Sequence, residues 1–257
     1  MRVRTWAAVA CAGLFVGGAT FAQPPKTEAP KAPDGAKAGD SLLTMIADAR
    51  GALGKARDYT CTFTRQEMRN GALGAEQVAE MKVRTNPGGV YVRFAQPDTI
   101  AGMEVAYTAA RKNLKFQYKP AGVAGAKGFK TIALDDSKFL AENRHPVTEW
   151  TMTAVLDRVA AATAREKTLN NPVEVYTGDF QFAGRNVTRY ELLTRRPHAF
   201  RYAHRMLVYV DKETKLPLRY EAYGEPKGTA AVGDLFEAYS FSDVKLNVGL
   251  GENTFDY

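Results

Sequence analysis

The residues most capable of acid–base or metal chemistry are few and lie far apart in the sequence. The chain of 257 residues has three histidines, His145, His198 and His204. Zinc sites take three or four ligands, often with cysteines at close spacing. The two cysteines, Cys11 and Cys61, lie too far apart to form such a motif with the histidines. The sequence therefore predicts neither a metal site nor a cofactor.

Nucleophilic catalysis has no recognisable motif either, because no serine stands in a Gly-x-Ser-x-Gly elbow. Cys61 alternates with Tyr59 and Phe63 along an expected strand, which predicts a buried, inert thiol. Glu67 and Glu80 are expected on the polar faces of their strands. We predict no catalytic residues and a protein that is not an enzyme. A hydrolase whose carboxylates meet only in three dimensions stays open as an alternative, since sequence spacing does not reveal such a pair.

The densest basic run, Arg195 to Arg205, carries interleaved aromatic residues. Such a run is typical of single-stranded nucleic-acid binding, where cations contact phosphates and rings stack on bases. An export signal is also expected at the start of the chain (see below), so we predict no nucleic-acid partner and expect contact with lipid head groups or envelope polymers. The alternative is a solvated rim of a sheet. A net charge of +7 is consistent with weak attraction to an anionic membrane surface.

Residues 1–22 have the parts of a Sec signal peptide. Arg2 and Arg4 form its basic region, Ala7 to Gly18 is apolar but too short to span a bilayer, and cleavage is expected near Ala22. This predicts a periplasmic or secreted protein, with a retained N-terminal anchor as the alternative. Residues 23–40 are rich in Pro, Ala and Lys, which predicts a disordered linker. Residues 41–257 then form a single domain.

The domain is dominated by short runs in which apolar and polar residues alternate, the pattern of half-buried strands. Tyr59, Cys61 and Phe63 alternate with threonines, and turn sequences such as Asn70-Gly71 separate the runs. This predicts about ten strands in two groups. The first group occupies 59–134, and the second is expected at 173–182, 186–194, 204–210, 216–223 and 235–241.

Two longer segments have apolar residues at helical spacing. Ser41 is expected to cap a helix that ends near Gly54, and Thr148 or Thr151 a second helix that runs to about Lys167. A short helix is expected over 138–144. Strands do not alternate with helices, which argues against a doubly wound fold. The sequence predicts an α+β fold: a large curved antiparallel sheet, or unclosed half-barrel, with two or three helices covering the concave face.

Aromatic and methionine side chains are abundant on the apolar side of the expected strands. Small helices leave part of a curved sheet unfilled, and such interiors often hold an apolar ligand. We therefore predict a hydrophobic binding site lined by Phe63, Phe94, Met103, Tyr107 and Phe116. The alternative is that these side chains form an ordinary core.

Several motifs together resemble a known family. In the first half they are Tyr59 to Glu67, Met81-Lys-Val-Arg, Val90-Tyr-Val-Arg-Phe-x-x-Pro97 and Gly102-Met-Glu. In the second half they are Leu216-Pro-Leu-Arg-Tyr-Glu-Ala-Tyr and Tyr239-x-Phe-x-Asp243-Val-Lys-Leu-Asn247. They are similar to the exported bacterial family known as domain of unknown function 1571. The resemblance implies distant similarity to LolA-like and RseB-like periplasmic lipoprotein-binding folds, which hold acyl chains, and it supplies no catalytic residues.

These observations predict a non-enzymatic, exported cell-envelope protein that binds the acyl chains of a lipid or a lipoprotein, as a carrier or a sensor. The expected partner is a lipid or a lipidated protein. The alternative is a binding or regulatory module that recognises a protein or a polysaccharide through its surface and has a filled core. A cavity of a few hundred Å³ favours the first function, and a filled interior favours the second.

Overall fold

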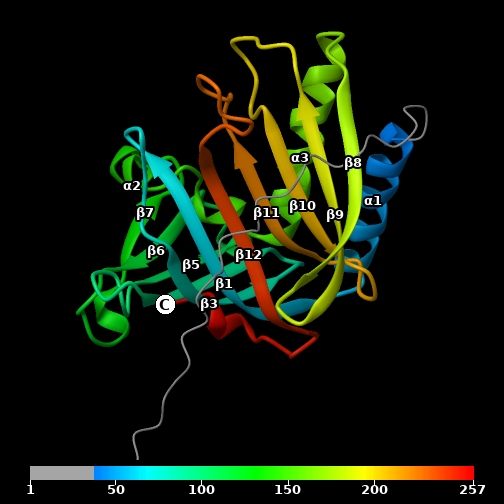
Figure 1. Ribbon diagram of the computed structural model, residues 1–257. Helices are drawn as coiled ribbons and strands as arrows, with labels where there is room; N and C mark the ends of the chain where they lie inside the picture. The colour runs from blue at the N-terminus through cyan, green and yellow to red at the C-terminus, as the bar shows by residue number, and fades with distance from the viewer. Residues whose placement is uncertain (1–37) are drawn as a thin grey trace, which may run out of the picture. The chain divides into compact units, whose positions relative to one another are not determined.

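The computed structural model describes residues 38–257, which lie within one compact unit. These residues form three α-helices and one antiparallel sheet of 12 strands (Figure 1). The helices are α1 (Ala38–Gly54), α2 (Ser137–Glu142) and α3 (Met152–Thr168). The strands are β1 (Asp58–Arg69), β2 (Ala72–Leu73), β3 (Gln77–Arg84), β4 (Gly89–Gln96), β5 (Glu104–Thr108), β6 (Lys115–Lys119), β7 (Lys130–Ala133), β8 (Val173–Phe182), β9 (Arg185–Thr194), β10 (Arg205–Asp211), β11 (Pro217–Tyr223) and β12 (Leu235–Leu246). The expected signal peptide and residues 23–37 of the expected linker lie outside the described residues.

The strands follow one path between two free edges. Their order is β7-β6-β5-β4-β3-β1-β12-β11-β10-β9-β8, and β2 pairs only with β1. β1 and β12 join the two halves of the sheet, with Phe63 opposite both Ala79 on β3 and Phe241 on β12. Within residues 38–257 the edge strands β7 and β8 do not pair with each other, so the sheet stays open. The predicted α+β fold with a large unclosed antiparallel sheet is confirmed.

Two helices cover one side of the second half of the sheet. α1 lies against β8, α3 contacts β8 and β11, and the two helices contact each other (Figure 1). α1 begins at Ala38, three residues before the expected cap Ser41. α3 begins after Thr151, whose hydroxyl accepts from the Ala154 N–H at 3.2 Å. No helix in the described part of the chain is both long and apolar enough to cross a membrane.

Trp150 fills the centre of the side that the helices cover. It follows the short 3-10 turn η3 (Val147–Glu149) and is 0% exposed. The centroid of its ring lies 6.4 Å from Phe63, 6.2 Å from Phe94 and 5.9 Å from Phe139 of α2. Its Nε1 donates to the carbonyl oxygen of His145 at 3.1 Å. The centre is therefore packed with aromatic rings.

The C-terminal residues 247–257 cover part of the opposite side of the sheet. The carboxylate of Asp58 accepts from the backbone N–H groups of residues 248–250 at 2.6–3.2 Å. Phe255 packs with Tyr91 and Ala106 in a second, smaller apolar cluster. A Cβ at Gly89 would come within 2.9–3.1 Å of the Phe255 ring, so this close approach requires glycine. The segment thereby packs closely against the start of β4.

Replacement of Trp150 by alanine tests whether this ring supports the fold. We expect Trp150→Ala to lower the free energy of unfolding by about 3–5 kcal/mol, because the lost burial adds to the cost of the cavity left behind. Urea denaturation followed by far-UV circular dichroism measures the change. Leu114→Ala is the control, since Leu114 is 75% exposed and should change stability by only about 0.5 kcal/mol or less. Equal losses in the two variants would contradict the role assigned to Trp150.

Candidate ligand pocket and buried charge cluster

A pocket of about 510 Å³ opens at the end of the sheet where β1 begins. This volume lies within the range of roughly 300–1,000 Å³ that is usual for small-molecule sites. Its lining comes from the end of α1, from β3, β4 and β5, and from the residues around the start of α3. The lining residues are Arg50, Leu53, Gly54, Val83, Arg84, Thr85, Gly88, Gly89, Val90, Tyr107, Ala109, Thr148, Thr151 and Thr153.

One wall of the pocket is apolar because neighbouring strands place their inward side chains in register. Val83 on β3 is directly opposite Val90 on β4, and Val90 is opposite Tyr107 on β5. Residues opposite each other in an antiparallel pair point to the same face. Leu53, in the last turn of α1, extends this wall from the helix side. The result is a continuous surface suited to a hydrocarbon chain.

The other wall and the mouth of the pocket are polar. Thr148, Thr151 and Thr153 contribute hydroxyl-bearing side chains from η3 and the start of α3. Arg50 of α1 forms an ion pair with Asp157 of α3 at 2.6 Å, and the two side chains are 47% and 58% exposed. The pocket therefore combines an apolar wall with polar groups at its rim, an arrangement that fits an amphiphilic ligand.

The five residues predicted to line a hydrophobic site lie in different places. Tyr107 lines the pocket. Phe63, Phe94 and Phe116 are 0%, 1% and 0% exposed in the packed centre, and Met103 packs against the same core. A binding role for all five residues stays a prediction.

Sequence reasoning missed most of the residues that do line the pocket. Val83 alternates with Lys82 and Arg84 in a visible strand pattern, which marks it as inward-facing but does not say which end of the sheet stays open. The threonines near the start of α3 were interpreted only as possible helix caps. Thr151 is both the cap and part of the pocket wall.

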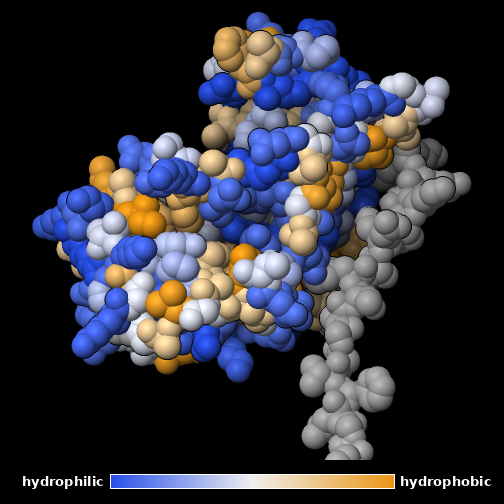
Figure 2. Space-filling view, turned by 90° about the vertical axis from the view of Figure 1, so that its left-hand side faces the viewer, coloured by the Kyte–Doolittle hydropathy of each residue, from blue (hydrophilic) through white to orange (hydrophobic). Residues whose placement is uncertain are grey.

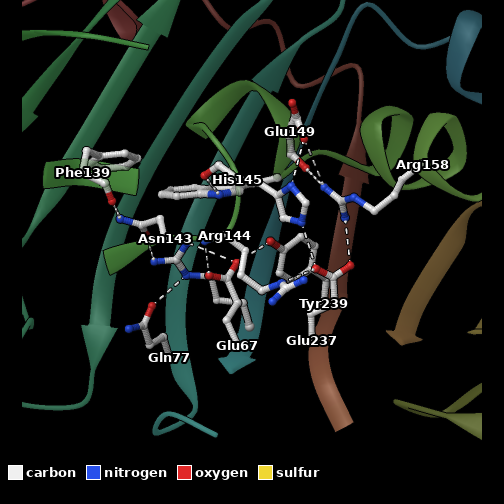
Figure 3. A network of polar contacts seen from close by, with 12 residues as sticks. Glu67, Gln77, Phe139, Asn143, Arg144, His145, Glu149, Arg158, Glu237 and Tyr239 are labelled. Carbon is white, nitrogen blue, oxygen red and sulfur yellow. Dashed lines mark hydrogen bonds and ion pairs between the residues drawn. The ribbon is translucent and has the colours of Figure 1, made fainter. Parts of the chain in front are cut away.

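A cluster of buried charged side chains occupies the other end of the same side of the sheet (Figure 3). At its centre is Glu237 of β12, which is 0% exposed. Its carboxylate lies 2.8 Å from Nε2 of His145 and 3.5 Å from Nη1 of Arg158, and it accepts from the Tyr202 hydroxyl at 2.6 Å. Nε of Arg144 lies 3.2 Å from the same carboxylate. The cluster thus ties β12 to α3, to the segment before η3 and to the loop after β9.

A second carboxylate in the cluster, Glu67 of β1, corrects a sequence interpretation. Glu67 was expected on the polar face of its strand, but it is only 8% exposed and lies on the same face as Phe63. It accepts from the Tyr239 hydroxyl and from the Arg144 N–H. The rule that charged residues of a strand face solvent fails here, because a buried carboxylate that accepts several hydrogen bonds can occupy a position on the apolar face. Glu80 is exposed, as expected.

Arg65 connects this cluster to the aromatic centre. Its guanidinium lies 4.1 Å from the centroid of the Trp150 ring, and burial lowers its pKa. Its Nε and Nη2 donate to Gln77 at 2.7 Å and to Asn143 at 2.6 Å. Arg65 therefore fixes the position of Trp150 from the strand side.

The charge states follow from the contacts. His145 places Nδ1 3.0 Å from Glu149 and Nε2 2.8 Å from Glu237. Ionised carboxylates only accept hydrogen bonds, so both ring nitrogens carry protons and the ring is cationic. Burial lowers the pKa of His145, but the hydrogen bonds to the two carboxylates outweigh it and the pKa is raised. Burial raises the pKa of Glu237, yet His145, Arg158 and Tyr202 together lower it to about 2.

This arrangement is poorly suited to acid–base catalysis. Both nitrogens of His145 are engaged, and Glu237 is ionised and held by cations. Burial raises the pKa of the Cys61 thiol, which therefore stays protonated at neutral pH. No group of three or more His, Cys, Asp or Glu residues within 38–257 is placed to hold a metal ion. The cluster acts as a set of structural ties.

The open antiparallel sheet, with helices on one side and a pocket at one end, defines this protein as an unclosed half-barrel. The chain belongs to the family described as protein of unknown function (DUF1571), whose family model matches residues 56–257. The family resemblance inferred from the motifs is confirmed.

Several solved structures are similar to this chain. An uncharacterized conserved protein from Thermus thermophilus is 11% identical, with a TM-score of 0.48 over 84% of this chain and 93% of that chain. The lipoprotein LppX of Mycobacterium tuberculosis is 11% identical, with a TM-score of 0.47 over 82% and 98%. In the MucA/MucB complex of Pseudomonas aeruginosa the identity is 15% and the TM-score 0.47 over 84% and 61%, so this chain spans less than two thirds of that chain. No curated protein matches the chain.

The importance of the charge cluster can be measured by neutralising its central carboxylate. We expect Glu237→Gln to lower the free energy of unfolding by about 3–5 kcal/mol, because buried cations lose their partner. Glu213→Gln is the matched control, since Glu213 also pairs with an arginine but is 82% exposed. It should change stability by about 0.5 kcal/mol or less. Urea denaturation of both variants measures the two changes. A Glu237→Gln protein as stable as the control would show that the charge cluster is not needed for stability.

The contribution of His145 to stability should depend on pH in a defined direction. Its raised pKa means that the contribution is complete below the unfolded-state pKa of 6.5 and is lost as pH rises through the folded-state value. The lowered pKa of Glu237 means that its contribution is complete above 4.5 and is lost as pH falls towards about 2. We therefore expect the stability difference between wild type and His145→Gln to be largest between these two limits and to shrink above pH 6.5.

Denaturant titrations at stepped pH on the two proteins measure this difference. Burial lowers the pKa of His204, so the contribution of His204 to stability changes with pH in the opposite direction. His204 is present in both proteins, so its contribution cancels in the difference. A difference that stays constant as the pH is raised would contradict a cationic His145.

Proposed function

We propose that this protein is a non-enzymatic, exported cell-envelope protein that binds an acyl chain of a lipid or a lipidated protein in the end pocket. The observation that supports the proposal best is the 510 Å³ pocket with its continuous wall of Leu53, Val83, Val90 and Tyr107. The hydrocarbon would lie along this wall. The head group would lie at the mouth, near Arg50 and the threonines.

The energetics set a minimum length for the ligand. Each methylene moved out of water contributes about 0.8 kcal/mol. Association costs an estimated 4–15 kcal/mol in lost translational and rotational freedom. On the order of five to twenty buried methylenes are therefore needed before binding becomes favourable. The proposal requires affinity to rise with chain length until the pocket is full.

A second candidate function is recognition of a protein or a polysaccharide through the surface. The packed centre around Trp150 favours it, because aromatic side chains and not an open space occupy that part of the interior. The two functions differ in one measurable respect. Acyl-chain binding requires that hydrocarbon enters the pocket, and surface recognition does not.

Displacement of a fluorescent fatty acid by saturated fatty acids of increasing length tests the proposal. We expect affinity to rise with length and then to level off, and we expect Thr153→Trp and Ala109→Trp each to lower it by about tenfold or more, or ~1.4 kcal/mol. Both positions are exposed and line the mouth, so the added ring narrows the pocket without disturbing the core.

Ala161→Trp is the matched control, because Ala161 is an exposed position of α3 that does not line the pocket. It should bind the probe as wild type does. Mass measurement of the natively purified protein gives a second readout, since a bound lipid adds its mass. Absence of bound lipid together with no probe uptake would sink acyl-chain binding and leave surface recognition.

A further inference from the structure

Three segments meet at the end of the sheet opposite the pocket, and we call them the tip surface. They are residues 165–171 at the end of α3, residues 195–204 between β9 and β10, and residues 224–234 between β11 and β12. Nε2 of His198 lies 3.0 Å from Glu166, and Asn171 donates to the carbonyl oxygen of Arg196 at 2.9 Å. Glu225 pairs with Arg201 and lies 3.1 Å from Nδ1 of His204. These contacts hold the three segments side by side.

Each of the three segments exposes one large apolar side chain. Leu169 is 47% exposed, Phe200 is 68% exposed and Val232 is 41% exposed. Single exposed apolar residues are normal on a protein surface, whereas several gathered on adjoining segments are typical of interaction sites. Figure 2 shows hydrophobic residues at the upper end of the molecule, surrounded by hydrophilic ones. In Figure 1 the same end carries the turns after α3, β9 and β11.

The tip surface is also basic. Its segments contain six lysines and arginines against three acidic residues. Of the acidic residues, Glu166 is 3% exposed and is engaged with His198. Arg165, Lys167 and Arg196 are exposed and have no acidic partner within residues 38–257. The surface therefore presents unneutralised cations around the exposed apolar side chains.

The tip surface is anchored to the rigid part of the fold. Tyr202, in the middle of the β9–β10 loop, donates its hydroxyl to the buried Glu237 at 2.6 Å. Nε of Arg195, at the start of the loop, pairs with Glu174 of β8 at 2.6 Å. The loop is thus fixed at two points, and Phe200 projects from it without a large cost in ordering on binding.

We propose that the tip surface docks on the anionic surface of a lipid bilayer. Phe200, Leu169 and Val232 enter the boundary between head groups and acyl chains, and the cations lie at the level of the lipid phosphates. A soluble polyanion would satisfy the cations but offers no apolar phase for Phe200. The docking end is distinct from the pocket, so this interaction does not depend on acyl-chain binding.

Co-sedimentation with vesicles tests the proposal. We expect the protein to bind vesicles of phosphatidylglycerol mixed with phosphatidylcholine, to bind pure phosphatidylcholine far more weakly, and to dissociate as salt is raised. Each neutralised cation should lower the affinity about fivefold. The triple variant R165Q/K167Q/R196Q should thus lose on the order of 100-fold. The double variant Leu169→Ser with Phe200→Ser should lose about tenfold or more on the same vesicles.

The β5–β6 connection supplies the matched control. Leu114 is 75% exposed and lies between the exposed residues Lys112 and Lys115, but it is at the other end of the sheet from the tip surface. Leu114→Ser and K112Q/K115Q should leave vesicle binding within about twofold of wild type. All proteins carry the same N-terminus, so differences come from the substituted positions alone. Equal losses from the tip and control variants would overturn the proposal.

Binding to dextran sulfate, a soluble polyanion, tests the remaining explanation, which is that the tip surface binds polyanions in general. If the Leu169→Ser and Phe200→Ser substitutions leave vesicle binding unchanged while the cation variant loses binding to both vesicles and dextran sulfate, the surface binds polyanions and not a bilayer. Thermal unfolding at wild-type temperature in every variant shows that the exposed substitutions act on binding and not on folding.

Discussion

The burial of Trp150 is the contact on which the rest of this structure depends. An open sheet leaves one face that must be covered, and α1 and α3 cover it mainly over the β8–β12 half. The segment from His145 to Thr151 completes the cover by placing the Trp150 ring against Phe63 and Phe94. Because this ring fills the middle, the interior is divided into two ends with different chemistry. The pocket and the charge cluster are the consequences of that division.

The charge cluster holds the segment that carries Trp150. His145 begins the segment and is bound by Glu237, while Arg158 of α3 reaches both Glu237 and Glu149. Buried ion pairs contribute little net stability compared with apolar packing, but they enforce one geometry, because any shift leaves a charge without a partner. Such ion pairs are useful in a short segment without regular structure, because its own backbone hydrogen bonds do not fix its conformation. The cluster therefore determines the position of the Trp150 ring more than it adds to the stability of the core.

The sequence predicted the elements that rest on local periodicity. Alternation along 173–182 matched β8 at both ends, and α3 begins after Thr151, one of the two threonines expected to cap it. It did not predict Trp150, because a side chain in a short irregular segment follows no period and its position depends on tertiary contacts. It also placed Glu67 on the wrong face of β1, because a charged residue in an alternating pattern is normally assigned to the solvent-exposed face of the strand. The pocket lining was missed for a related reason: the pattern gives the face of a strand, but the covering elements decide which part of that face stays open.

The Trp150 ring also limits the length of ligand that the end pocket can hold. A ligand that extends from the pocket towards the centre must displace Trp150, whose segment is fixed at one end by His145 and at the other by the capped start of α3. Displacement would expose a fully buried ring and leave Glu237 short of a partner, and both changes are unfavourable. A ligand in the end pocket therefore meets this barrier before it reaches the centre of the half-barrel. If the end pocket binds an acyl chain, as proposed, the Trp150 ring restricts it to a short or partly inserted chain, and the buried charges around His145 hold that ring in place.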